Sequence, residues 1–487
     1  MQQLTGMDAM FLHTEMDGFP MHIGGISIYD QSTAKGGKVR FKDILSTFEK
    51  RLHRSPIFRR KLQKVPMGLD QPYWVDDDKF DIEYHIRHIA LPKPGDWRQL
   101  CIQAARLHAQ PLDMNRPLWQ AYVIEGLNNV DGVPPGSFAL YIKVHHAAMD
   151  GATGVQFFGA FNDMELNPKP EKHIPVWNPE PRPGKGGMLR RAYVNNLKKP
   201  WQMVKLAGEA MPARKRLKAG KDEGRFRSIE DKETTRFNRD ISQHRVVESR
   251  RFPFEDIRTI KNAIEGATVN DAVLAIIGGA MRTYLDAHGE LPENSLVTSC
   301  PIDVRDESER EAGGNMVGMM NVALRTDIAD PMQRLIAVHE EASQAKAYAE
   351  AMGPRIGMDT ADTVPGGIIS SVMRLAVASG LAQKNVMTNT VVTNVPGSPF
   401  QLYLCGAKLV DSIGIGVLAP GVGLFHTVNS MVMNKKGTII ISALACRDLM
   451  PDPEFYAECL QGSFDELFAA ATAADTGNKA AAGKKRA

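Results

Sequence analysis

A pair of histidines followed by an aspartate is the part of this sequence whose residue types could do chemistry. The run reads His145-His146-Ala147-Ala148-Met149-Asp150-Gly151. Before it, every second residue is apolar, which predicts a strand over residues 138–144. Alternate residues of a strand share a face, so we expect His146 to continue the apolar face and His145 to point the other way. An imidazole, whose ordinary pKa is about 6.5, suits a general base at neutral pH.

Other roles for these histidines remain open at this point. Histidines are often structural, and a pair followed by an aspartate could also bind a metal. The metal interpretation is disfavoured because the sequence has no H-E-x-x-H and no Cys or His cluster at ligand spacing nearby. A serine hydrolase is disfavoured because no G-x-S-x-G occurs.

Composition narrows the class of protein. The chain has 487 residues, 43% of them hydrophobic, which is enough for a sizeable core. Its net charge of +3 argues against a nucleic-acid-binding protein. The five cysteines are scattered without a C-x-x-C pair, which is typical of reduced thiols in a cytoplasmic protein. The N-terminus lacks the basic region of a signal peptide, and no apolar stretch reaches the ~20 residues needed to span a bilayer. Any membrane association is therefore expected to be peripheral.

The elements that must position the histidines fall into two α/β halves. Residues 1–176 mix strand patterns at 23–29 and 82–91 with an amphipathic helix pattern at 41–52. Residues 246–468 again mix both, with strands expected at 391–395 and 438–444 and a helix beginning at Asp452-Pro453. A helix is also expected at 152–161, directly after the histidine run. The tail, residues 469–487, is small and polar and is expected to be disordered.

A basic linker, residues 177–245, separates the halves. It opens with proline and glycine, and residues 185–227 hold 13 Lys/Arg against three acids. Leu189, Tyr193, Leu197 and Trp201 recur every fourth position, which indicates a helix that Pro200 should kink or split. Such a stripe with flanking cations could lie on a membrane or a lipid droplet. A solvated connector and a binding site for CoA phosphates are the alternatives.

The run H-H-A-A-M-D-G fits H-H-x-x-x-D-G, the signature of the CoA-dependent acyltransferase superfamily. Further segments resemble the bacterial wax ester synthase/diacylglycerol acyltransferase family in order and spacing. They are residues 7–12 (M-D-A-M-F-L), 20–24 (P-M-H-I-G), 80–85 (F-D-I-E-Y-H), Pro117-Leu118-Trp119, Asn270-Asp271 and 394–397 (N-V-P-G). These matches are spread over nearly the whole chain.

The resemblance implies a fold and a reaction. The fold is of the α/β class with mixed sheets, built as two chloramphenicol-acetyltransferase-like subdomains with an active-site tunnel between them. The reaction transfers a fatty acyl group from acyl-CoA to a long-chain alcohol or to diacylglycerol, giving a wax ester or triacylglycerol. No cofactor or metal is implied, because acyl-CoA is a substrate. The partners are then acyl-CoA and the acceptor lipid, and no nucleic acid.

The resemblance also assigns roles to residues. His146 would be the general base, with no acyl-enzyme, and Asn270 would bind the oxyanion or the histidine partner unless it is merely a helix N-cap. His145, Asp150 and Gly151 would be structural, with Asp150 paired to Arg305. Residues 117–119 would line the tunnel or an interface. Two other functions stay open: a condensation-type acyltransferase with a carrier-bound donor, and a catalytically inactive lipid-binding protein of the same fold.

Overall fold

The computed structural model describes residues 2–149, 157, 159–171, 173–225, 233–303, 317–352, 366–381, 388–433 and 436–484. In the first third of the chain its elements are β1 (Gln2–Gln3), α1 (Gly6–Thr14), β2 (His22–Asp30), α2 (Phe41–Arg51), β3 (Arg60–Gln63), β4 (Tyr73–Asp76), α3 (Ile82–His85), β5 (Ile86–Ala90), α4 (Trp97–Ala109), β6 (Trp119–Leu127) and β7 (Ser137–His145). Side chains of Thr5, Asp81 and Asp96 cap the three helices that follow them, as polar residues do before a first helical turn.

The rest of the chain begins with one long helix, α6 (Lys185–Asp222). After it come β8 (Arg245–Pro253), α7 (Phe254–Asn262), α8 (Val269–Ala287), β9 (Val297–Asp303), β10 (Val317–Ala323), α9 (Pro331–Met352) and α11 (Gly366–Ala378). The last elements are β11 (Thr390–Pro396), β12 (Tyr403–Leu404), β13 (Ala407–Ile415), β14 (Leu424–Met433), β15 (Lys436–Cys446) and α13 (Pro453–Lys484).

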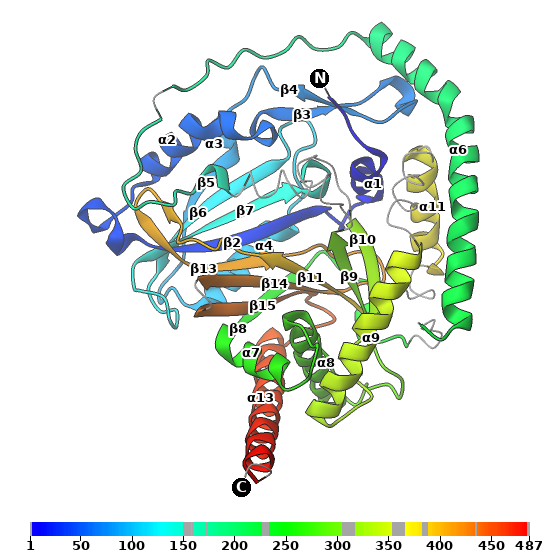
Figure 1. Cartoon of the computed structure of the whole chain (residues 1–487). Helices are drawn as coiled ribbons and strands as arrows, with labels where there is room; N and C mark the ends of the chain where they lie inside the picture. The colour runs from blue at the N-terminus through cyan, green and yellow to red at the C-terminus, as the bar shows by residue number, and fades with distance from the viewer. Residues whose placement is uncertain are drawn as a thin grey trace.

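Two six-stranded mixed sheets form the body of the molecule (Figure 1). The first has the order β12-β13-β2-β7-β6-β5, and the second has the order β10-β9-β11-β14-β15-β8. A small sheet, β1-β4-β3, lies beside the first. Strands β5 and β6 run parallel, as do β9, β11 and β14, so both large sheets mix directions as expected.

The halves are not independent in space. Strand β13 comes from the C-terminal part of the chain but pairs with β2 of the first sheet, from Lys408 opposite Asp30 to Ile415 opposite Gly24. The expected domain of residues 246–468 therefore gives up one hairpin to the N-terminal sheet. The pattern of alternating residues in a strand does not specify the partner strand, so only the tertiary structure determines that β13 pairs with β2.

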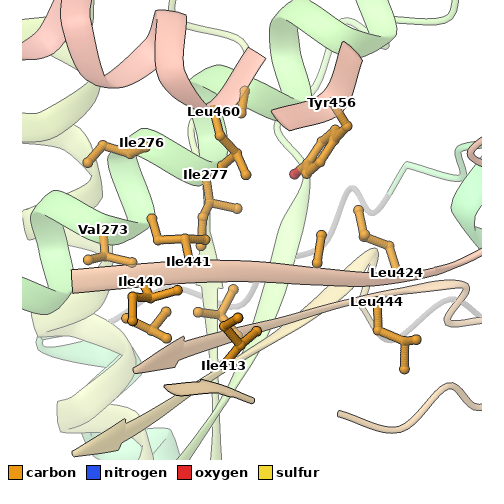
Figure 2. Packing of buried hydrophobic residues seen from close by; sticks show 14 of the residues in the cluster. Val273, Ile276, Ile277, Ile413, Leu424, Ile440, Ile441, Leu444, Tyr456 and Leu460 are labelled. Atoms are coloured by element: carbon orange, nitrogen blue, oxygen red, sulfur yellow. The ribbon is translucent and has the colours of Figure 1, made fainter. Parts of the chain in front are cut away.

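The larger of two extensive hydrophobic clusters spans both sheets. Strand β15 contributes side chains to this cluster from both of its faces. In Figure 2, Ile441 points toward Ile277 of α8, and Ile440 points the opposite way, toward Ile413 of β13. Tyr456 and Leu460 of α13 pack over the same side as α8. Burying each such aliphatic side chain contributes about 1.5–3 kcal/mol, so this contact between halves is a main source of rigidity.

Three local expectations need correction. Residues 82–91 are not one strand: they form α3 and then β5, because Asp81 caps a helical turn through the Glu83 N–H. Helix α6 runs through Pro200 and Pro212 without splitting, and Figure 1 shows it curving around the body. Residues 469–484, expected to be disordered, continue α13, since alanine is the best helix former.

Candidate active site

The end of strand β7 places the two histidines. The strand stops at His145, which lies opposite His22 of β2, and His146 begins a short 3₁₀ helix, His146–Ala148. The His145 N–H donates to the Leu118 carbonyl at 2.9 Å, and the His146 N–H donates to the Met21 carbonyl at 2.8 Å. Backbone hydrogen bonds to two different neighbouring segments therefore hold His146 at the C-terminal end of β7, an inner strand of the sheet.

His145 is a structural residue. Its side chain is fully buried, its Nδ1 accepts the Ala147 N–H at 3.0 Å, and its Nε2 lies 2.9 Å from Oε2 of Glu15. Because Nδ1 accepts, Nε2 carries the proton and donates to the carboxylate. The same Glu15 oxygen accepts the Met21 N–H at 2.9 Å. Both imidazole nitrogens are thus occupied, which leaves His145 no free nitrogen for a substrate.

His146 is covered on one ring face and enclosed at one ring nitrogen. Phe11 of α1 stacks on the ring, with 3.8 Å between centroids and 14° between planes. The Nδ1 atom is buried and has no hydrogen-bond partner among the described residues, yet the side chain as a whole keeps some exposed surface. Nδ1 is thus enclosed, and the Nε2 edge is the remaining candidate for contact with a substrate.

Burial also sets the protonation state of this ring. It lowers the pKa of His146 to about 4, against a smaller raising effect of the residue's own backbone carbonyl. A histidine with this pKa is neutral at pH 7. It can accept a proton there without first losing one, which is what a general base requires.

Asn270 begins helix α8 but does not cap it. The cap is Thr268, whose hydroxyl accepts the Asp271 N–H at 3.2 Å while the Asp271 carboxylate accepts the Thr268 N–H at 2.8 Å. The alternative that Asn270 is merely an N-cap is therefore wrong. Its side chain is half-buried in the first helical turn, and the structure records no hydrogen bond from it to a described residue, His146 included.

A side-chain contact with a neighbouring helix also holds this helix end. The ring Nδ1 of His339, on α9, lies 2.9 Å from Oδ2 of Asp271, which is buried. The Asp271 carboxylate thus ties the first turn of α8 both to its own cap and to a neighbouring helix. Asn270 consequently sits on a backbone segment with little freedom, at the positive end of a helix.

The remaining predicted site residues have different outcomes. Asp150, Gly151 and Arg305 lie outside the described residues, as does most of the helix expected at 152–161. Pro117, Leu118 and Trp119 are buried, and Trp119 donates its indole N–H to the Phe58 carbonyl at 3.1 Å. Trp119 is wholly inaccessible, so it supports the strand that carries the histidines, and the assignment of residues 117–119 to a tunnel wall stays a prediction.

Lys143 is a buried charge that its strand pattern alone did not reveal. It lies on the same face of β7 as His145, and its Nζ donates to the carbonyls of Leu107 at 2.8 Å and Gln110 at 2.5 Å. Burial lowers the pKa of Lys143 to about 7. Cations satisfy the free carbonyls at a helix C-terminus, so Lys143 fixes the end of α4 behind the active-site strand.

Glu15 and Phe11 are the neighbours of the histidines that the sequence analysis missed. Both come from the N-terminal segment, and Glu15 lies 130 positions from the histidine that it contacts. Neither has a local signal of its role. Among the described residues no group of three His, Cys, Asp or Glu could hold a metal ion. The described helices include none with the length and apolar character to cross a membrane.

Comparison with known protein families gives matches along most of the chain. Residues 4–273 match the wax ester synthase/diacylglycerol acyltransferase catalytic domain, and residues 313–468 match the C-terminal domain of that family. A Mycobacterium tuberculosis protein provisionally named a diacylglycerol O-acyltransferase is 32% identical, over 98% of this chain and 99% of its own length. Another from the same organism is 30% identical, over 96% and 91%.

Solved structures show the same fold. The wax ester synthase/diacylglycerol acyltransferase from Marinobacter aquaeolei VT8 superposes with a TM-score of 0.67 at 24% identity, over 97% of this chain and 100% of that one. The first condensation domain of the CDA synthetase superposes with a TM-score of 0.53 at 14% identity, over 96% and 97%. The expected architecture of two chloramphenicol-acetyltransferase-like halves is thereby confirmed.

Proposed function

Because the chain belongs to the wax ester synthase/diacylglycerol acyltransferase family, we propose that it transfers a fatty acyl group from acyl-CoA to a lipid hydroxyl. The acceptors are diacylglycerol, as the names of its relatives suggest, and a long-chain alcohol. The products are triacylglycerol and a wax ester. All five cysteines are free thiols, which supports a reducing compartment such as the cytoplasm.

His146 is the general base of this proposal. As the acceptor oxygen forms a bond to the thioester carbonyl carbon, its proton passes to Nε2 of His146. The carbon–sulfur bond then breaks, and the leaving CoA thiolate takes that proton from the imidazolium. The products are the ester and CoA–SH, and no acyl-enzyme forms. The observation that carries this proposal is a buried imidazole whose backbone is fixed at a strand end and whose Nδ1 has no hydrogen-bond partner among the described residues, with burial lowering its pKa to about 4.

The low pKa of His146 has a chemical consequence. A buried imidazole is a weaker base than a solvated one, so the imidazolium must be stabilised where it forms. The oxyanion that develops at the thioester carbonyl supplies a nearby opposite charge. We propose that the Asn270 side-chain amide, at the N-terminal end of α8, donates to that oxyanion. Its lack of a described hydrogen-bond partner and its fixed backbone support this role.

The test is release of CoA thiol from palmitoyl-CoA with and without hexadecanol or dipalmitoylglycerol. We expect acceptor-dependent release by the wild type and its loss in His146→Ala, with an unchanged melting temperature. The matched control is His145→Ala, which should lower the melting temperature because it leaves Glu15 and the Ala147 N–H without their partner. A His146→Ala variant with near wild-type turnover would overturn the mechanism.

The same assay separates the competing functions. Chromatography of the products against a panel of alcohols and diacylglycerol decides between wax ester and triacylglycerol synthesis. Transfer only from an acyl group on a carrier protein would instead support the condensation-type acyltransferase, whose fold this chain shares. Binding of acyl-CoA without release in the presence of any acceptor would support an inactive lipid-binding protein.

A further inference from the structure

Helix α6 carries apolar side chains on the side that faces away from the protein. Met188, Ala192 and Ala213 are buried and mark the side that packs on the body. Five exposed apolar residues form one set, with Tyr193 at 68%, Val194 at 44%, Leu197 at 63%, Trp201 at 76% and Val204 at 62%. Met211 is also exposed on that side, and Met203 is exposed on the flank nearer the buried residues. At about 100° per residue, the exposed set is centred about 180° around the helix from the buried set. We call these five exposed residues the outer stripe.

The contacts that hold α6 leave the outer stripe uncovered. Asn195 donates to Asp70 at 2.7 Å, Asn196 donates to the Leu69 carbonyl at 2.8 Å, and Arg216 donates to the Ala351 carbonyl at 3.0 Å. Figure 1 shows α6 as the outermost element on its side of the molecule, beyond α9 and α11. The helix is therefore attached by its inner side along much of its length, while its apolar surface faces outward.

Charge accompanies the outer stripe. Helix α6 contains eleven Lys/Arg and only two acids, Glu209 and Asp222. Arg190, Lys198 and Lys215 are exposed, and helical spacing places them within or beside the outer stripe. A helix with aromatic and aliphatic residues bordered by cations is the pattern of an interfacial helix on an anionic lipid surface.

We propose that α6 docks this protein on an anionic phospholipid bilayer by inserting the outer stripe among the head groups. Tyr193 and Trp201 suit the boundary region, because one end of each ring system is apolar and the other is polar. Each nearby Lys or Arg adds attraction to the anionic surface. The charge distribution disfavours a second copy as the occupant, since a two-fold contact through this stripe would bring cations against cations.

The position of α6 gives the docking a purpose, which rests on the proposed function. Helix α11 lies between α6 and α1 in Figure 1 and contacts α1. It exposes two further apolar side chains, Val372 and Leu375. Helix α1 carries Phe11, which stacks on His146. The bilayer, where acceptor lipids dissolve, would then lie on the side of the molecule that leads to the proposed base.

The test is flotation of the full-length protein with vesicles of phosphatidylcholine containing phosphatidylglycerol, compared with pure phosphatidylcholine. We expect binding to the anionic vesicles that weakens with salt, and at least a tenfold loss of binding in the double variant Leu197→Glu/Trp201→Glu. The matched control, Val176→Glu/Phe400→Glu, makes the same change of charge at two exposed apolar residues outside α6 and should bind like the wild type.

Activity in detergent separates this inference from the proposed function. The Leu197→Glu/Trp201→Glu variant should release CoA at the wild-type rate when the acceptor is dispersed in detergent micelles. Absence of acyl transfer in a wild type that floats with anionic vesicles would contradict the proposed function alone. Wild-type protein that does not float, or a double variant that floats as well as the wild type, would overturn the docking proposal. So would sedimentation showing that the substitutions dissociate a dimer.

Discussion

Replacing Phe11 by alanine should move the acid limb of the pH–rate profile upward. Burial lowers the pKa of His146 from 6.5 to about 4. This difference corresponds to a free-energy cost of about 3.4 kcal/mol for protonating the ring in the folded protein. Phe11 covers one face of the ring at 3.8 Å, and its removal admits water there. We expect the pKa of His146 to rise by about one unit, because only part of the burial of the ring is lost.

The direction in which kcat/KM changes with pH follows from the role of His146 as the base. Neutral His146 is the active form, so kcat/KM falls as the pH falls through the pKa of the free enzyme. At pH 5 the wild type should keep about nine-tenths of its plateau kcat/KM, and Phe11→Ala should keep about half. The ester product is extracted and measured by chromatography at each pH, with circular dichroism as the check that the protein stays folded.

The matched control is Phe11→Leu, which keeps an apolar side chain over the ring and should retain an acid limb close to that of the wild type. Coincident acid limbs for Phe11→Ala and the wild type would refute the idea that this contact sets the pKa of the base. A wild-type limb near pH 6.5 would refute the buried, weakly basic His146 itself.

Three further changes test the surroundings of the base. Glu15→Ala leaves the His145 ring and a backbone N–H without an acceptor, so we expect a loss of about 1–3 kcal/mol per group in chemical denaturation and recovery in Glu15→Gln; equal stability of Glu15→Ala and the wild type would contradict this. Trp119→Ala should destabilise the fold by about 3–5 kcal/mol, because the side chain is wholly buried, while the acyl chain-length preference stays the same. A changed chain-length preference at full stability would instead support the assignment of Trp119 to the tunnel. His339→Ala removes the partner of the Asp271 carboxylate on α9 and should lower kcat more than it raises KM. His339→Asn should restore kcat, because its side-chain amide can replace Nδ1. A kcat of His339→Ala equal to that of the wild type would show that His339 does not position Asn270.

Predictions that depended on nearest neighbours agree best with the structure. The alternation before the histidines is confirmed as β7, and the strands expected at 23–29, 391–395 and 438–444 are confirmed as β2, β11 and β15. The helix start at Asp452-Pro453 is also confirmed. These features follow from side-chain periodicity and capping, which a short segment expresses by itself.

Predictions that rested on composition agree less well with the structure. Residues 82–91 have the composition of a strand, but the Asp81 side chain stabilises one helical turn before the strand begins. The tail was judged by its small, polar composition, although its alanines favour a helix that continues α13. At residues 82–91 and in the tail, a short-range helix signal, the Asp81 cap or the alanine content, decides the structure, and overall composition does not.

The amino-acid sequence alone determined the histidine pair, the strand that leads into it and the family to which the chain belongs. Only the tertiary structure decided what surrounds those rings: Glu15 on His145, Phe11 on His146 and the Asp271–His339 pair beside Asn270. It also decided that β13 joins the N-terminal sheet. The physical reason is that side-chain periodicity specifies which face of an element is buried, whereas the partner on that face depends on how distant elements pack, and the pKa of a base is set by those partners.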